Sequence, residues 1–367
     1  MTNVKILHLA PENTAGVPYN LMKMQRQFGI YSRLITFYNV PYDYPEDVCL
    51  NLTLSRSPLA MKWRNYKKKR LHSKLYGDEL WTHLPYYKPG NLAERVYLKY
   101  REFKNSRRFE ESLKKLEADS FDVIHFDGGI DFYSDSRTAK LFKSRGKKIV
   151  NCYFGDDLRT RGIVKEMDEL SDLNLTFEYD HTLRHPSINF LFFPFDLSEI
   201  PYITDEKYYS SEQIRIIHSP TDRFVKGTYE IINAVESAKK YHNFEFILAE
   251  NMPRKKLLEL KQTCHIAIDQ IGNRGGTGYG INSLESLSMG IPTVTDMNCG
   301  MDKWLPENPF IIANKDNLSE ILVSLLSDKT MLKKYRDMSR QWVNKYHSYD
   351  AVFRKLKEYY LSAGINL

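Results

Sequence analysis

Short apolar runs alternate with helical patterns along most of this chain, and the alternation starts twice. The first series opens with a predicted strand at residues 4–9, a helix at 19–28 and a second strand at 32–38. Strands separated by helices in this way form parallel sheets with helices on both faces. The pattern stops in an acidic, Pro-bearing stretch at residues 193–207 and restarts at 214–218. The sequence therefore predicts two doubly wound α/β domains that face each other across a cleft.

The rest of both series follows the same periodicities. In the first series, further strands are predicted at residues 121–126, 148–154 and 173–177. In the second series, strands are predicted at 245–249, 266–270, 293–295 and 310–312, and helices at 228–241, 253–264, 281–289 and 318–326. Residues 60–118 are helical in pattern, charged and Tyr-rich, which indicates an insertion rather than a core element.

Chain length limits the number of domains. One hydrophobic core stops growing at about 250–300 residues, so a chain of 367 residues with 42% hydrophobic residues fits two domains. We expect residues 1–200 to form an N-terminal domain that carries the insertion and residues 201–345 to form a second domain. Residues 346–367 are expected to form a helix that returns to the first domain.

Cysteine spacing and hydropathy exclude several classes of protein. The four cysteines stand singly, which indicates neither a disulfide framework nor a zinc site. The N-terminal segment, residues 4–10, is shorter and more polar than the core of a signal peptide. The densest apolar run, residues 188–195, is much shorter than the ~18 residues of a membrane span. We therefore expect a cytoplasmic protein.

Positive charge is concentrated in the first third of the chain. The net charge is +7, and residues 1–110 hold 19 Lys or Arg against 9 Asp or Glu. The densest part, residues 62–74, has seven basic side chains, no acidic one, and interleaved aromatic residues. Such a segment suits an anionic membrane surface or an anionic acceptor, or it is simply the solvated face of a helix. No recognised nucleic-acid-binding module accompanies the charge, so we expect no nucleic-acid partner.

Glycines crowd the segment that precedes one helix of the second series. Gly275, Gly276, Gly278 and Gly280 let the backbone approach a ligand closely. The predicted helix that begins at Ile281 offers unpaired amides and a positive dipole end, which together can hold an anion such as a diphosphate without a metal.

One carboxylate and two cations complete the candidate site. Glu285, one turn into this helix, can accept hydrogen bonds from both hydroxyl groups of a ribose, or it is a partly exposed glutamate that favours the helix start. Arg223 and Lys226, in the loop after the strand at 214–218, can neutralise a diphosphate as it leaves. The alternatives are surface cations without a ligand, or cations paired with Asp222.

These segments resemble a known family. Residues 214–300 resemble the donor-binding domain of retaining, family 4-type glycosyltransferases with the GT-B fold, especially bacterial members with the motifs H-A-P-S-N-R-x-x-K-G-T, I-D-Q and E-A-M-A-x-G-K-P-V. The resembling residues are 218–228, 268–270 and 285–294. The resemblance implies that Arg223 and Lys226 contact the diphosphate and that Glu285 contacts the ribose. The donor site it implies consists of Ser219, Arg223, Lys226, Gly278, Tyr279, Gly280, Ile281 and Glu285, with Gly16 from the first domain.

The first half resembles the same family more loosely. Gly16 lies in a loop that resembles the family's glycine-bearing loop, and Asp127 stands where the family has its usual active-site histidine. Asp127 is then either a hydrogen-bonding group near the reacting sugar or a simple strand-end aspartate. His125 stands two positions earlier, in the predicted strand at residues 121–126. Thr277 replaces a second glutamate of many members, which affects how the transferred sugar is held. A G-S-D-L-R-like element supplies the acceptor-side candidates Asp156, Asp157 and Arg159.

The resemblance implies a hexosyltransferase of surface polysaccharide or glycoconjugate biosynthesis that moves a sugar from a nucleoside-diphosphate sugar to a hydroxyl of a glycan or lipid-linked acceptor, with retention. The basic segment at residues 62–74 separately predicts attachment to the inner face of the membrane. The catalytic candidates of the implied enzyme are Arg223, Lys226 and Asp127. No cofactor or metal is expected, because the carboxylate pairs that could bind one belong to the first domain and the diphosphate to the second. The alternatives are a catalytically silent GT-B subunit that binds a nucleotide sugar or glycan, and a nucleotide-sugar epimerase.

Overall fold

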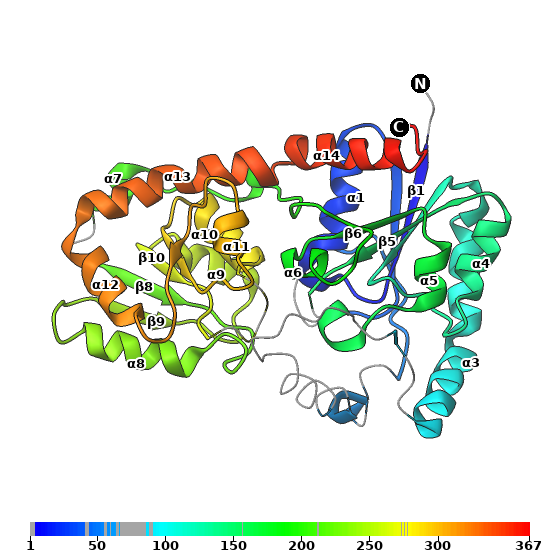
Figure 1. Ribbon diagram of the computed structural model, residues 1–367, viewed down its shortest axis with the longest axis horizontal. Coiled ribbons are helices and arrows are strands. Elements are labelled where there is room, and N and C mark those ends of the chain that lie inside the picture. Colours follow the sequence, from blue (N-terminus) through cyan, green and yellow to red (C-terminus); the bar gives the residue numbers. More distant parts are fainter. Residues whose placement is uncertain are drawn as a thin grey trace. The chain divides into compact units, whose positions relative to one another are not determined.

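The computed structural model describes residues 4–40, 44–54, 57–58, 60–63, 66, 86–87, 91–155, 157–210, 213–272, 274, 276 and 278–367. The chain divides into two compact units (Figure 1). Unit 1 comprises Met1–Pro194 and Val352–Leu367, and unit 2 comprises Phe195–Ala351. Each unit contains its own parallel sheet, so the prediction of two doubly wound α/β domains is confirmed.

Unit 1 contains a seven-stranded parallel sheet in the order β3-β2-β1-β4-β5-β6-β7. The strands are β1 (Lys5–Ala10), β2 (Tyr31–Thr36), β3 (Val48–Cys49), β4 (Val123–Asp127), β5 (Lys148–Tyr153), β6 (Leu173–Thr176) and β7 (Ile188–Phe190). After β1 the chain builds outward through β2 and β3, and then places β4 on the other side of β1. The carboxyl ends of β1 and β4 therefore form a switch point, where open α/β sheets bind ligands.

Helices of unit 1 flank this sheet. They are α1 (Val17–Gln27), α3 (Leu92–Lys115), α4 (Arg137–Ser144), α5 (Lys165–Leu170), α6 (Tyr179–Thr182) and most of α14 (Tyr349–Ser362). The Phe353 ring of α14 stacks on Phe28, with 4.0 Å between the ring centroids. The hydroxyl of Tyr360 lies 2.5 Å from Nε2 of His125. The last helix of the chain thus packs against α1 and the sheet of unit 1.

Unit 2 contains a five-stranded parallel sheet in the order β12-β11-β10-β8-β9. The strands are β8 (Arg215–His218), β9 (Glu245–Leu248), β10 (Ile266–Ile268), β11 (Thr293–Thr295) and β12 (Ile311–Ile312). The helices are α7 (Asp205–Tyr209), α8 (Thr228–Ala238), α9 (Arg254–Lys261), α10 (Ile281–Ser288), α11 (Met301–Trp304), α12 (Leu318–Ser327) and α13 (Lys329–His347). The direction of sheet growth reverses between β8 and β10, so the loops after these two strands begin side by side.

The observed elements differ from the predicted ones at their ends and in several omissions, which include the short helices α4, α5, α6, α7 and α11. The strand predicted at 266–270 ends at Ile268, and the helix predicted at 228–241 ends at Ala238. The strands β3 and β7 and the long helix α13 were not predicted. Of the predicted insertion at 60–118, the described part includes α3, whereas most of the basic segment at 62–74 lies outside the described residues. No described helix is both long and apolar enough to cross a bilayer.

Candidate active site

The loop after β8 and the loop after β10 touch each other at the switch point of unit 2. In the sheet, His218 pairs with Ile268, the last residue of β10. Further along, the amide of Ile271 donates to the carbonyl of Lys226 at 3.1 Å. Gly227 has a φ of +66°, and a Cβ atom there would lie 1.8 Å from the carbonyl oxygen of Ile271. A glycine is therefore required where the two loops approach and α8 begins.

Lys226 points into a buried polar cluster. Its Nζ lies 2.7 Å from Oδ1 of Asp269 and 3.2 Å from Oε1 of Gln270. The lysine side chain is 15% exposed and that of Asp269 is 1% exposed. Burial raises the pKa of Asp269, but the Lys226 charge and the hydrogen bonds from Lys226, Ser283 and Asn282 outweigh this and leave it below its usual value. Asp269 is therefore a buried anion that holds the ammonium group in place.

Arg223 is held by a different carboxylate. Its guanidinium binds Glu250 with two hydrogen bonds, one of them at 2.7 Å from Nε to Oε1. Glu250 follows β9, and the pair is open to solvent. Asp222 accepts from the amide of Val225 at 2.9 Å, and no ion pair joins it to either cation in the described part of the chain. The alternative in which Asp222 neutralises one of the cations is therefore wrong.

The N-terminus of α10 lies beside this cluster. Gly280 precedes the helix, no side chain caps its first amides, and its first turn contains no acidic residue. Ser283 donates to Oδ2 of Asp269 at 2.7 Å, and Ser219 donates to Oδ1 of Asn282 at 2.8 Å. These bonds tie the first turn of α10 to both loops. The arrangement leaves a positive helix end next to Lys226, which suits an anionic ligand.

Glu285 is buried and doubly paired. Only 3% of the residue is exposed, so the alternative of a partly exposed glutamate at the helix start is wrong. Its Oε1 accepts from Nε of Arg254 at 2.8 Å, and its Oε2 accepts from Nζ of Lys261 at 2.9 Å. Lys261 is itself fully buried and also donates to the carbonyl and the Oδ1 of Asn282, at 2.9 and 2.7 Å. Arg254 and Lys261 of α9 thus fix the orientation of the Glu285 carboxylate.

The remaining predicted donor residues lie around the start of α10. At Gly278 a Cβ would lie 2.8 Å from the Sδ of Met301, so the Met301 side chain would have to shift to admit one. The Tyr279 ring packs against Phe310, and its hydroxyl lies 3.1 Å from Nε2 of His347. In the structure Tyr279 therefore packs within unit 2. Thr277 and Gly275 lie outside the described residues.

His218 links the end of β8 to the first turn of α8. Its Nδ1 donates to the carbonyl of Ile268 at 2.9 Å, and its Nε2 accepts from the hydroxyl of Thr228 at 2.9 Å. Because a carbonyl can only accept, a neutral ring here carries its proton on Nδ1 and leaves Nε2 to accept. Burial lowers the pKa of His218 from 6.5 to about 4. The neutral ring thereby fixes both ends of the loop that carries Arg223 and Lys226.

This geometry predicts a loss of stability in acid. Between pH 6.5 and about 4, His218 is protonated in the unfolded chain but stays neutral in the folded protein. The free energy of unfolding should therefore fall by roughly 3 kcal/mol as the pH falls from 6.5 to about 4. We expect NMR of the His218 ring to show no titration above pH 5, and His218→Gln to lose this part of the pH dependence. A His218 ring that titrates near pH 6.5 would contradict the assignment.

In unit 1, Asp127 is the last residue of β4 and Gly16 lies in the loop after β1, so both are at the β1–β4 switch point. Asp127 is fully buried, with Oδ2 at 3.3 Å from Nδ1 of His8. Its Oδ1 is buried and has no partner among the described residues. Gly16 has a φ of +72° and precedes α1, and a Cβ there would lie 2.8 Å from the Tyr44 ring. Asp127 thus offers one free acceptor oxygen at the end of β4.

His8, His125 and Asp127 form the one group of three potential metal ligands in the described part of the chain. Their ligand atoms lie within 4.8 Å of one another. The rings are already engaged, since Nε2 of His8 lies 2.9 Å from Oε1 of Gln25 and His125 contacts Tyr360. Burial lowers the pKa of His125 well below its usual value, so this ring is neutral. The absence of a catalytic metal stays a prediction.

The acceptor-side candidates differ in their surroundings. Arg159 is 5% exposed, and its guanidinium binds Glu178 and Asp180, at 2.5 Å each. Burial raises the pKa of Asp180, but the Arg159 charge beside it holds this pKa well below the usual range. Asp157 accepts from the amide of Phe154 at 3.1 Å. Arg159 is therefore part of a buried ion-pair cluster, and Asp156 lies outside the described residues.

No protein family and no curated protein sequence matches this chain. Among solved structures, the N-terminal domain of trehalose-6-phosphate phosphatase from Candida albicans is 10% identical, with a TM-score of 0.64 over 100% of this chain and 98% of its own. HepE (Alr3699) of Anabaena, in complex with UDP, is 9% identical, with a TM-score of 0.62 over 97% of this chain and 99% of its own. An alpha-glucosyltransferase in complex with UDP and a 13-mer DNA is 9% identical, with a TM-score of 0.59 over 98% of this chain and 99% of its own. The last two proteins are GT-B glycosyltransferases. This chain has the GT-B fold.

The GT-B fold confirms the fold class predicted from the sequence, whereas membership of family 4 stays a prediction. One GT-B neighbour was solved with DNA, so the comparisons do not support the expectation that this chain has no nucleic-acid partner.

Proposed function

We propose that this GT-B chain transfers a hexosyl group from a nucleoside-diphosphate sugar to a hydroxyl of a glycan or lipid-linked acceptor. In this reaction the bond between the sugar and the diphosphate breaks, a bond to the acceptor oxygen forms on the same face of the sugar, and the acceptor releases a proton. The product belongs to a surface polysaccharide or glycoconjugate. The enzyme works in the cytoplasm or at the inner face of the membrane, with residues 62–74 as the expected contact.

The observation that carries the proposal is the pairing of a buried cation with an uncapped helix end. Lys226 lies beside the first turn of α10, whose amides no side chain caps. Charge develops on the diphosphate as the sugar leaves, and fixed donors aimed at that charge lower the barrier. Arg223 supplies a second cation, released from Glu250 when the ligand competes for it. This chemistry needs no metal ion.

Each unit offers one carboxylate that suits a sugar hydroxyl. Glu285 is held between Arg254 and Lys261, and a carboxylate in this position can receive the hydroxyl groups of a ribose. Asp127 keeps one buried oxygen without a partner among the described residues, which suits a hydroxyl of the transferred sugar. The UDP bound to two neighbours makes uridine the first base to test.

A ligand panel followed by a turnover assay tests the proposal. We expect one nucleoside diphosphate and its sugars to raise the melting temperature of the purified protein, with UDP as the first candidate. The matching nucleotide sugar should then release nucleoside diphosphate in the presence of a glycan acceptor, and EDTA should not prevent the release. NMR of the anomeric proton of the product reads out retention. Binding without turnover on any acceptor would favour the silent subunit, and conversion of the free donor would favour an epimerase.

A further inference from the structure

The helix α3 exposes an apolar face to solvent. Leu92, Val96, Tyr100 and Phe103 are 75%, 60%, 54% and 83% exposed. On a helix with 3.6 residues per turn these four positions fall within an arc of about 80°. Soluble helices normally turn such a stripe toward a core. Here the stripe lies on the side of α3 that faces away from unit 1.

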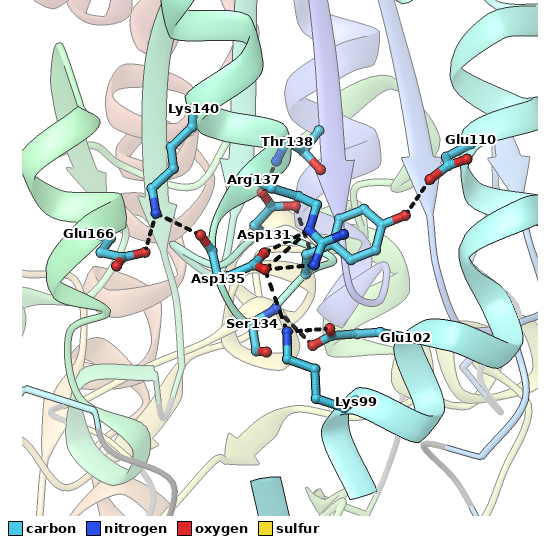
Figure 2. A network of polar contacts seen from close by, with 11 residues as sticks. Lys99, Glu102, Glu110, Asp131, Ser134, Asp135, Arg137, Thr138, Lys140 and Glu166 are labelled. Carbon is cyan, nitrogen blue, oxygen red and sulfur yellow. Dashed lines mark hydrogen bonds and ion pairs between the residues drawn. The ribbon is translucent and has the colours of Figure 1, made fainter. Parts of the chain in front are cut away.

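The opposite face of α3 is fixed to unit 1. Its buried residues are Glu102, Asn105, Phe109 and Ser112. Glu102 accepts from the amide of Ser134 at 2.8 Å, and Asn105 donates to the carbonyl of Thr53 at 3.2 Å. Figure 2 shows Glu102 and Glu110 on α3 reaching toward the loop that leads into α4. The helix is thus held by polar contacts on one side, and its apolar stripe is presented on the other.

Cations border the stripe on both sides. By helical position, Arg95 and Lys99 lie along one edge and Lys104 and Arg108 along the other, and all four are exposed. Lys99 pairs with Glu102 at 3.1 Å. Within the described residues, no ion pair joins Arg95, Lys104 or Arg108 to a carboxylate. An apolar stripe between two rows of cations is the pattern of a helix that lies in the plane of a membrane surface.

We propose that this face of α3 docks on the surface of an anionic lipid bilayer. The apolar side chains would enter the region between headgroups and acyl chains, while the flanking cations would contact lipid phosphates. A second copy of this chain fits less well, because a two-fold contact would place the same cations against each other. A nucleic acid would engage the cations but leave the exposed leucine, valine and phenylalanine without a partner. The proposal rests on α3 alone and does not require the proposed transferase activity.

Sedimentation with lipid vesicles tests the proposal on the full chain. Vesicles of equal parts phosphatidylcholine and phosphatidylglycerol should bind the protein, vesicles of phosphatidylcholine alone should bind it much less, and added salt should weaken binding by screening. Phe103→Ser should lower the partition coefficient about ten-fold or more. Removing the charge of Lys104 or Arg108 by substitution with Gln should lower it about five-fold each at low salt.

The matched control is Tyr241→Ser, which removes an aromatic side chain that is 73% exposed in unit 2 and should leave vesicle binding unchanged. Circular dichroism should show that every variant folds, since all the altered side chains are exposed. Absence of binding to anionic vesicles would overturn the proposal, as would binding that Phe103→Ser leaves intact. It would also fail if duplex DNA bound in place of vesicles, or if Phe103→Ser abolished a dimer instead.

Discussion

Substitution of Lys226 by methionine should lower kcat at least about 100-fold. Loss of one fixed donor to a developing negative charge costs about 2.7–4 kcal/mol of transition-state stabilisation. Lys226 is suited to this role because Asp269 and Gln270 hold its ammonium group beside the N-terminus of α10. The measurement is nucleoside diphosphate release under saturating donor and acceptor. Lys239→Met is the matched control, since Lys239 also belongs to the α8 region but pairs with the exposed Glu236.

A second substitution separates catalysis from folding. Lys226→Met leaves the buried carboxylate of Asp269 without its cation, and this alone is destabilising. The double variant with Asp269→Asn removes the stranded charge, so its melting temperature should recover while its turnover stays low. Recovery of turnover in the double variant would show that Lys226 serves the fold and not the leaving diphosphate. Arg223→Ala, which breaks only the solvent-exposed pair with Glu250, should also reduce turnover without a measurable loss of stability.

The sequence was sufficient to predict the strands of both sheets except β3 and β7. Central strands such as β1, β4 and β8 are continuous apolar runs, because helices cover both faces of a parallel sheet. The edge strands β3 and β7 have two and three residues, which is too short for any periodic signal. These short strands gain their hydrogen bonds only once a neighbouring strand is in place, so tertiary context decides whether they form.

The helix α13 was missed for a different reason. Its buried face includes Arg336, Ser339 and His347, and these polar residues hide the apolar periodicity. Arg336 is fully buried because it donates to the carbonyl of Gly290 at 2.9 Å and pairs with Asp205 at 3.0 Å. One local signal was available, since the side chain of Asp328 caps the first amides of the helix.

Within the candidate site, the spacing of the motifs predicted the cations Arg223 and Lys226 but not the ion-pair partner of Glu285. The loop with Arg223 and Lys226 and the start of α10 could be predicted, because each follows a strand of the same sheet. Lys261 could not, since its segment R-K-K-L-L-E-L-K has the composition of a solvated helix. Only the packing of α9 against α10 makes Lys261 a buried partner of Glu285. Contacts between residues so far apart in the chain leave no pattern in the sequence.

Substitution of Lys261 by methionine should destabilise unit 2 by roughly 3–5 kcal/mol, because it removes one partner of a buried ion pair. The Lys261 side chain is fully buried, and its ammonium group binds both Glu285 and Asn282. The measurement is hydrogen exchange of the α10 amides across a urea series, which reports the unfolding free energy of unit 2 separately from that of unit 1. Lys255→Met, at an exposed position of the same helix, should have little effect.

Addition of Glu285→Gln to Lys261→Met should restore much of the lost stability, since the buried carboxylate becomes a neutral amide and the Arg254 cation, whose side chain is 27% exposed, is still open to solvent. Binding of the nucleotide should respond differently. The single variant keeps the carboxylate next to Arg254, whereas the double variant has lost the ribose acceptor. We therefore expect the double variant to fold well and bind the nucleotide about ten-fold more weakly or worse, in line with a lost hydrogen bond to a charged group. Equal nucleotide affinity in the wild type and the double variant would assign Glu285 to the fold alone.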